Sequence, residues 1–134
     1  MARKAFRVLF VLWAGSLWSL AAWVAPTLFR AQGDRHLAGL LASRLFSIET
    51  YVGLGVAALA LLLPLPQRKN FAPGYAAAVL LAVNEWILKP VMSQAYAAGS
   101  AAGLGFGAWH GVSAVVYLGA CLGVLVLVWR GEGE

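Results

Sequence analysis

Four long apolar runs determine what this chain can fold into. They cover residues 8–28, 44–63, 73–92 and 106–129. Each is long enough to cross the roughly 30 Å hydrocarbon core of a bilayer as an α-helix, which takes about 20 residues. A segment in lipid must satisfy its backbone hydrogen bonds internally, and a helix does so. The runs therefore predict an all-α, integral membrane four-helix bundle, with residues 1–134 forming a single transmembrane domain.

The composition supports this fold class and excludes a soluble domain. Hydrophobic residues make up 62% of the chain and charged residues only 11%, whereas charged residues make up about 25% of soluble domains. The formal net charge of +5 is spread over the ends of the runs and forms no basic stripe. We therefore expect the lipid bilayer as the partner and no nucleic acid.

The first apolar run is expected to be a retained helix. A cleaved signal peptide also starts with basic residues, but its apolar core is shorter, about 7 to 15 residues. Small residues recur in this run at spacings of four, three and four, which predicts a stripe where another helix packs closely. The stripe comprises Gly15, Ser19, Ala22 and Pro26.

The positive charges predict the orientation of the bundle. Four spans put both termini on one side, and Lys and Arg are enriched on the cytoplasmic side. Six lie on the terminal side, namely Arg3, Lys4, Arg7, Arg68, Lys69 and Arg130. Four lie on the other side, namely Arg30, Arg35, Arg44 and Lys89. We therefore expect a multi-pass protein of the cell inner (plasma) membrane with its termini in the cytoplasm.

The third run holds an amide, an acid and a base within seven residues, from Asn84 to Pro90. Glu85 and Lys89 are four apart and share a helix face, so they can form an ion pair. An unpaired charge at mid-bilayer costs about 3 kcal/mol, and such residues usually face protein. Pro90 is expected to kink or end the helix. Whether residues 93–105 extend this helix or form a loop stays open.

Glu49, in the second run, has no basic residue four positions away. Its partner must come from another helix or from a ligand, and the small residues Gly53, Ala57 and Ala60 follow on its face. By the predicted topology, the polar residues of the runs fall in the outer half of the bilayer or at its edge, which predicts a polar pocket there. The pocket and ion-pair candidates are Arg44, Glu49, Asn84, Glu85, Lys89, His110 and Ser113.

Three functions fit these residues. The first is a non-enzymatic membrane protein, without catalytic residues or cofactor, whose pocket binds or passes a small solute or ion. The second is a redox protein that binds haem b or a metal through His110, alone or with His36. The third is a homo-oligomer or structural subunit of a membrane complex, with glycine stripes as contacts. The stripes are Gly103, Gly107 and Gly111, and Gly119 and Gly123.

Short motifs add a resemblance to a known family. These motifs are Trp13-Ala-Gly15, Ala25-Pro-Thr-Leu-Phe29 and Phe106-Gly-Ala-Trp-His-Gly-Val-Ser113. The chain resembles the transmembrane protein 205-like domain family, a group of uncharacterised four-helix membrane proteins that look distantly similar to copper-resistance protein D and the haem-linked HemJ proteins. The resemblance implies a four-helix membrane fold. Residues 5–29 contain no histidine, which departs from the haem-linked relatives.

Overall fold

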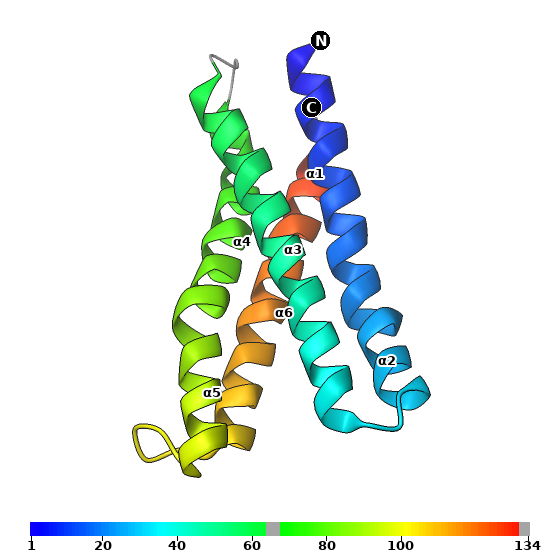
Figure 1. Cartoon of the computed structure of the whole chain (residues 1–134). Helices are drawn as coiled ribbons and strands as arrows, with labels where there is room; N and C mark the ends of the chain where they lie inside the picture. The colour runs from blue at the N-terminus through cyan, green and yellow to red at the C-terminus, as the bar shows by residue number, and fades with distance from the viewer. Residues whose placement is uncertain (64–67, 132–134) are drawn as a thin grey trace.

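The computed structural model describes residues 1–63 and 68–131, and four helices in it are long and apolar enough to cross a membrane (Figure 1). These candidate spans are Arg3–Ala31, Arg35–Leu62, Ala72–Ala98 and Phe106–Arg130. The predicted all-α membrane four-helix bundle is confirmed. The expected basic loop between the second and third spans falls partly on residues 64–67, which lie outside the described residues.

Each span has defined helical elements. The first consists of α1 (Ala2–Ser19), η1 (Leu20–Val24) and α2 (Ala25–Ala31), and the second is the single helix α3 (Arg35–Leu62). The short 3-10 turn η2 (Arg68–Phe71) precedes the third span, which consists of α4 (Ala72–Val83), η3 (Asn84–Leu88) and α5 (Lys89–Ala98). The fourth span is α6 (Phe106–Gly131).

Pro26 and Pro90 neither end nor break their helices. A proline has no N–H and its ring collides with the carbonyl four residues earlier, so a regular α-helix cannot continue unchanged. In both spans a π-helical segment, η1 or η3, lies just before the proline and widens the helix there. The N–H of Ala25 donates to the carbonyl of Leu20 in the first case. The prolines are accommodated by a wider turn, which the sequence analysis did not predict.

The helices of the second and third spans extend beyond their apolar runs. α3 begins at Arg35 because Asp34 caps it: the Asp34 carboxylate accepts hydrogen bonds from the N–H of His36 at 2.9 Å and of Leu37 at 3.3 Å. The third span continues to Ala98 and ends at Gly99, whose φ of 84° is left-handed and favours glycine. Residues 93–98 are therefore helical and residues 99–105 form the loop, which resolves the question left open by the sequence.

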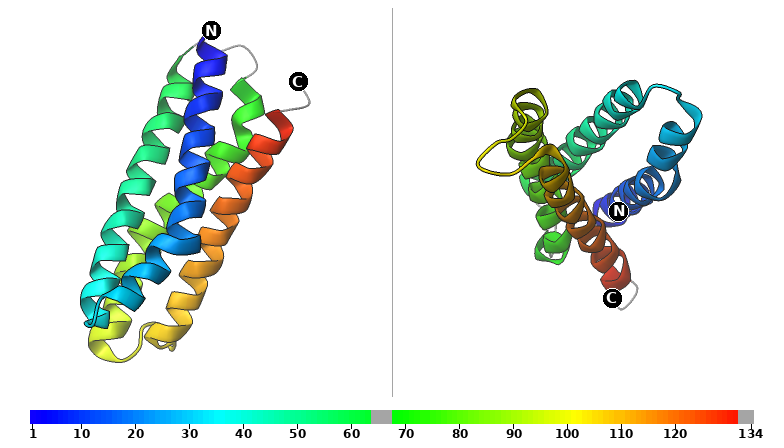
Figure 2. Two further views of the ribbon diagram at one scale, coloured as in Figure 1. Left: turned by 90° about the vertical axis from the view of Figure 1, so that its right-hand side faces the viewer. Right: turned by 90° about the horizontal axis from the view of Figure 1, so that it is seen from below.

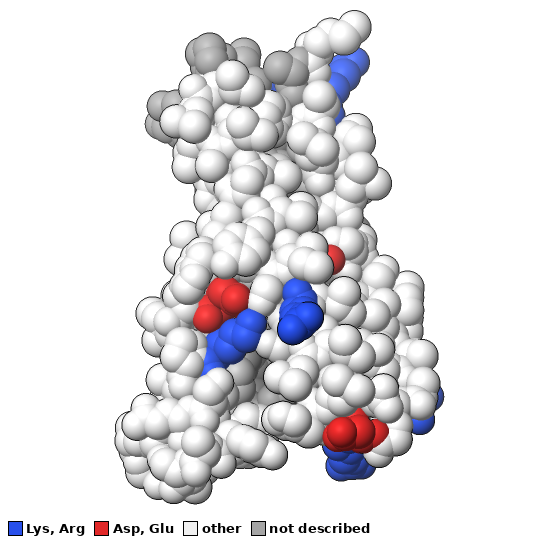
Figure 3. Space-filling view, in the orientation of Figure 1, with Lys and Arg blue, Asp and Glu red and all other residues white. Residues whose placement is uncertain are grey.

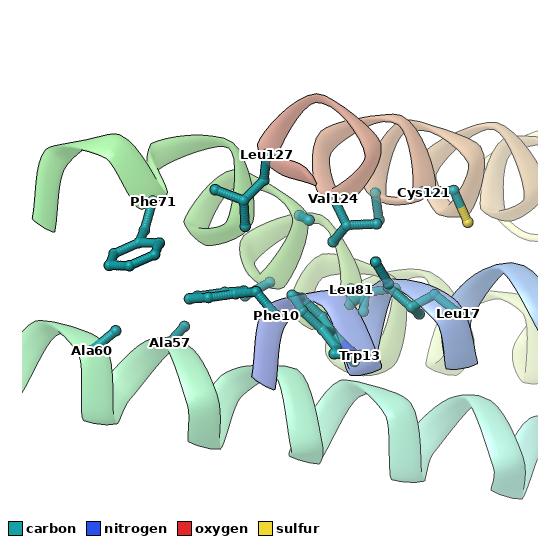
Figure 4. Packing of buried hydrophobic residues seen from close by; sticks show 14 of the residues in the cluster. Phe10, Trp13, Leu17, Ala57, Ala60, Phe71, Leu81, Cys121, Val124 and Leu127 are labelled. Carbon is teal, nitrogen blue, oxygen red and sulfur yellow. The ribbon is translucent and has the colours of Figure 1, made fainter. Parts of the chain in front are cut away.

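The core lies between the four spans and is built around large side chains of α1 (Figure 4). Phe10, Trp13 and Leu17 are at most 2% exposed. Phe10 stacks on Phe71, with ring centroids 5.2 Å apart. The predicted close-packing stripe of the first run is wrong, because Gly15 and Pro26 are exposed and the bulky face of α1 packs inward instead.

Two of the small-residue predictions on other helices are confirmed and one is not. Gly53, Ala57 and Ala60 of α3 are buried. A Cβ at Gly123 of α6 would lie 3.0 Å from the carbonyl oxygen of Pro73, so this stripe does pack closely. By contrast, a Cβ at Gly107 or Gly111 would meet no atom within 4 Å in the described part of the chain. Contacts within the described chain do not account for that stripe.

The four spans form two helical hairpins that pack at one end and diverge at the other (Figures 1 and 2). At the end where α1 begins and α6 ends, the terminal end, α1 packs on α3 and α6, and α4 packs on the same two helices. At the opposite end, the loop end, α2 packs on α3 and α5 packs on α6. The helices of the two hairpins therefore pack most closely in their terminal half, whereas toward the loop end they diverge and side chains such as His36 of α3 and Tyr96 of α5 meet between them.

The orientation of the bundle gives a direct prediction. α1 begins and α6 ends at the same end (Figure 2), and the charge count assigns that end to the cytoplasm. A reporter that is active only outside the cytoplasm should be silent when fused after Glu134, and the same reporter inserted in the loop of residues 99–105 should be active. The reverse pattern would place the loop end in the cytoplasm.

Candidate functional site

A three-residue polar network links α3 to the third span. Lys89 Nζ lies 3.2 Å from Glu85 Oε1 and donates a hydrogen bond to Ser47 Oγ at 2.6 Å. The Ser47 hydroxyl lies 2.8 Å from the same Glu85 oxygen. The predicted Glu85–Lys89 ion pair is present, and Ser47 of α3 completes it. The network therefore fixes α3 against η3 and α5 at mid-length of the third span.

A second polar contact links the third and fourth spans. Ser113 Oγ donates to Asn84 Oδ1 at 2.5 Å, and Asn84 Nδ2 donates to the carbonyl of Ser113 at 3.2 Å. Because η3 contains both Asn84 and Glu85, adjacent residues of one π-helical turn bind α6 and α3 respectively. Such turns often occur at functional sites.

Tyr117 of α6 joins the remaining span to this region. Its hydroxyl donates to the carbonyl of Leu17 in α1 at 2.7 Å, and its ring meets that of Phe46 edge-on, with centroids 4.8 Å apart. Tyr117 follows His110 by seven positions and Ser113 by four, so the three side chains share one face of α6. One side chain thus contacts α1 and α3 from α6.

All four spans contribute to one cavity of about 380 Å³ between the hairpins. Its polar lining residues include Asn84, Glu85, Lys89, His110 and Ser113, five of the seven predicted pocket residues. The other lining residues are mostly apolar, namely Ala21, Ala25, Phe29, Phe46, Thr50, Leu81, Met92, Ala114, Tyr117 and Leu118. This size and lining are typical of small-molecule sites, which are mostly apolar with a few placed polar groups.

The exposure of the lining residues shows where the cavity is closed and where it is open. Thr50, Leu81 and Tyr117 are buried and form its floor. On one side the Glu85–Lys89–Ser47 network joins α3 to the third span. On the other side, several lining residues of α2 and α6 are exposed. Those residues are Phe29, His110, Ala114 and Leu118. The mouth therefore lies between α2 and α6.

Two predicted pocket residues do not line this cavity. Glu49 contacts α1 instead: Ser16 Oγ lies within hydrogen-bond distance of Glu49 Oε2, at 2.7 Å, and Trp13 Nε1 donates to the Glu49 backbone carbonyl at 3.1 Å. The expectation that its partner comes from another helix is met, but that partner is a hydroxyl rather than a cation. Arg44 is exposed and makes no ion pair within the described residues.

The two histidines do not meet. His36 stacks on Tyr96 at a centroid distance of 5.6 Å, and His110 stacks on Phe106 at 5.8 Å. Tyr96 and Phe106 contact each other edge-on between them. Two aromatic rings thus separate the imidazoles, whereas ligands of one metal ion must both approach it to about 2 Å. In this arrangement His36 and His110 do not converge on one ion.

The depth of the polar residues differs in part from the prediction. Glu49 and Glu85 are at mid-length of their spans, because α3 and α5 extend beyond the apolar runs toward the loop end. Lys89, His110 and Ser113 lie closer to the loop end. Figure 3 shows the acidic and basic groups of this face mainly in its loop-end half. The polar site thus reaches from the loop end to the middle of the bundle.

Sequence reasoning missed Ser16 and Ser47, the hydroxyl partners of the two acids. Both serines lie in apolar runs, and no helical spacing relates Ser16 to Glu49 or Ser47 to Glu85. The only available signal was general: an acid in lipid needs hydrogen-bond donors, and serine is a donor that an apolar helix tolerates. The pairing itself depends on which helices become neighbours.

Residues 8–101 match the model of a family described as a domain of unknown function, DUF4149. The chain belongs to this family. The DUF4149 match contains η3 and the Glu85–Lys89–Ser47 network, while His110 and Ser113 lie beyond it. It establishes no link to the transmembrane protein 205-like or copper-resistance protein D families. Comparisons with curated proteins and with solved structures give no match to this DUF4149 chain.

Proposed function

We propose that this DUF4149 protein binds a small amphiphilic solute in the cavity between its hairpins. The observation that carries the proposal is that all four spans line one cavity and bring Asn84, Glu85, Lys89, His110 and Ser113 to it. Intramembrane polar residues are costly, and where they line a cavity they usually serve a ligand or a pathway. The DUF4149 match names no ligand.

The chemistry of the lining supports an amphiphilic solute. The side chains of η1, α2 and α3 that reach the cavity are almost all apolar, whereas η3, α5 and α6 supply the amide, the ion pair and the imidazole. Glu85 and Lys89 neutralise each other, so the cavity has no large net charge to select a simple ion. A solute with a compact apolar part and one hydrogen-bonding group matches the apolar side and the polar side of this cavity.

A solute pocket of this kind must admit water, which cysteine labelling can test. In a Cys121→Ala background, Ala114→Cys puts a thiol in the cavity wall, and Val115→Cys puts one on the neighbouring face, where Val115 is 69% exposed and would meet lipid. A charged, membrane-impermeant maleimide needs the thiolate, which forms in water and not in hydrocarbon. We expect labelling at position 114 and none at position 115.

The control for this experiment is full denaturation in detergent, after which both variants should label equally. Protection of position 114 in the membrane, at the level of position 115, would contradict a water-accessible pocket. Labelling from the side opposite to the loop end would show that the cavity opens toward the termini instead.

A further inference from the structure

Glu49 does not line the cavity, and its side-chain partner is a serine hydroxyl rather than a cation. It lies at mid-length of α3, and its partner Ser16 is in the middle of the first span. Ser16 is exposed and Glu49 is partly exposed, so the pair lies along the outer seam between α1 and α3. A lipid-soluble molecule can therefore approach the carboxyl from the bilayer.

No cation balances this carboxyl among the described residues. Lys89, the basic residue at comparable depth, is bonded to Glu85 and Ser47. Arg44 precedes Glu49 by five positions on the same helix and forms no ion pair with it. The titratable groups of α6 nearby, Tyr117 and Cys121, are buried and carry no positive charge. An isolated carboxylate in hydrocarbon is costly, and the neutral acid avoids that cost.

The hydrogen bonds of Ser16 accommodate the neutral form. Ser16 Oγ lies 2.7 Å from Glu49 Oε2 and 3.0 Å from the carbonyl oxygen of Trp13. A serine hydroxyl has one proton to donate, so it cannot donate to both oxygens at once. Both contacts are hydrogen bonds at the same time if Glu49 carries a proton and donates it to Ser16, while Ser16 donates to Trp13. These hydrogen bonds do not by themselves distinguish Glu49 from Glu85, because Ser47 lies 3.0 Å from the Ser43 carbonyl oxygen and 2.8 Å from Glu85 Oε1. The two acids differ in the cation beside them.

We propose that Glu49 and Ser16 form a proton-binding site at the middle of the membrane, separate from the cavity. Its ligand is a proton held on Glu49 and directed at Ser16 Oγ. Glu85 differs, because Lys89 keeps an ammonium 3.2 Å from its carboxylate and stabilises the ionised form. Two acids at similar depth thus hold different protonation states, set by their partners. The inference does not depend on what the cavity binds.

Dicyclohexylcarbodiimide distinguishes the two acids. This lipid-soluble reagent reacts with a protonated carboxyl: the acid proton moves to one nitrogen of the carbodiimide, and the carboxyl oxygen adds to its central carbon. The acyl group then shifts from oxygen to nitrogen and leaves a stable N-acylurea that contains all atoms of both reactants. In membranes of the full-length protein we expect one adduct per chain, located at Glu49 by mass spectrometry.

Three variants make the test specific. Glu49→Gln should lose the adduct completely, and Glu85→Gln should keep it on Glu49. Glu49→Gln should still fold, because its amide can donate to Ser16 as the neutral acid does, and thermal unfolding in detergent checks this. Ser16→Ala should keep the adduct, since the cation-free surroundings remain. An adduct at Glu85 and not at Glu49, or no adduct in the unmodified protein, would overturn the proposal.

Discussion

Replacing Gly53 by alanine should strongly destabilise the bundle, although alanine is normally the better helix former. A Cβ at this position would lie 2.0 Å from Cζ2 of Trp13, 2.5 Å from Cε2 and 2.8 Å from Cη2. Trp13 is 2% exposed and its indole N–H is bonded to the Glu49 carbonyl, so the ring has little room to retreat. Overpacking of this kind costs about 3 kcal/mol. We expect a loss of that order in the free energy of unfolding, measured in detergent.

Gly55, two residues along the same helix, provides a matched control. A Cβ at Gly55 would meet no atom within 4 Å, so Gly55→Ala should leave stability unchanged or raise it slightly through helix propensity. The three contacted atoms all belong to the six-membered ring of the indole, so adding Trp13→Phe should recover part of the loss in Gly53→Ala. Equal stability of Gly53→Ala and Gly55→Ala would show that α1 and α3 do not pack as described.

Lys89→Met should produce the second large loss. The substitution removes the ammonium that holds Glu85 and leaves the carboxylate with Ser47 alone. Breaking a buried ion pair from one side costs about 3 to 5 kcal/mol. Lys89 is 36% exposed, so we expect a smaller loss, about 2 kcal/mol in the free energy of unfolding. The double variant Glu85→Gln/Lys89→Met should recover much of it, because no uncompensated charge remains.

Two comparisons separate this effect from a general loss of charge. Arg44→Met removes a cation without an ion-pair partner in the described chain and should cost little. Glu49→Gln combined with Lys89→Met should give the sum of the two single effects, since Glu49 bonds to Ser16 and not to Lys89. Rescue of Lys89→Met by Glu49→Gln would mean that these residues pair, against the observed network.

Much of the fold could be predicted because it depends on local properties of the chain. The length and hydrophobicity of the four runs require spanning helices. The spacing of four between Glu85 and Lys89 requires that they share a face, and the ion pair is present. The small residues after Glu49 marked a buried face of α3 correctly. In each case the determining distance lies within a few residues of one helix.

The partners across helices depended on the tertiary structure. Ser16 and Ser47 became the hydrogen-bond partners of Glu49 and Glu85 only because α1 and the third span pack on opposite sides of α3. The stripe at Gly15 was misassigned for a similar reason. Burial of the large side chains of Phe10 and Trp13 stabilises the packing of α1 more than a close helix approach at its small residues would. Apolar residues surround every helix of a membrane protein, so sequence periodicity alone identifies the protein-facing side poorly.

The apolar runs alone establish four membrane-spanning helices and the need to shelter a few polar residues among them. The packing of the helices sets which of those residues share a cavity, leaves Glu49 and Arg44 outside it, and places two aromatic rings between His36 and His110. The physical reason is that the cost of a polar group in lipid is a property of the residue. The way that cost is met depends on which helices become neighbours, and on the π-helical turns that let Pro26 and Pro90 continue their helices.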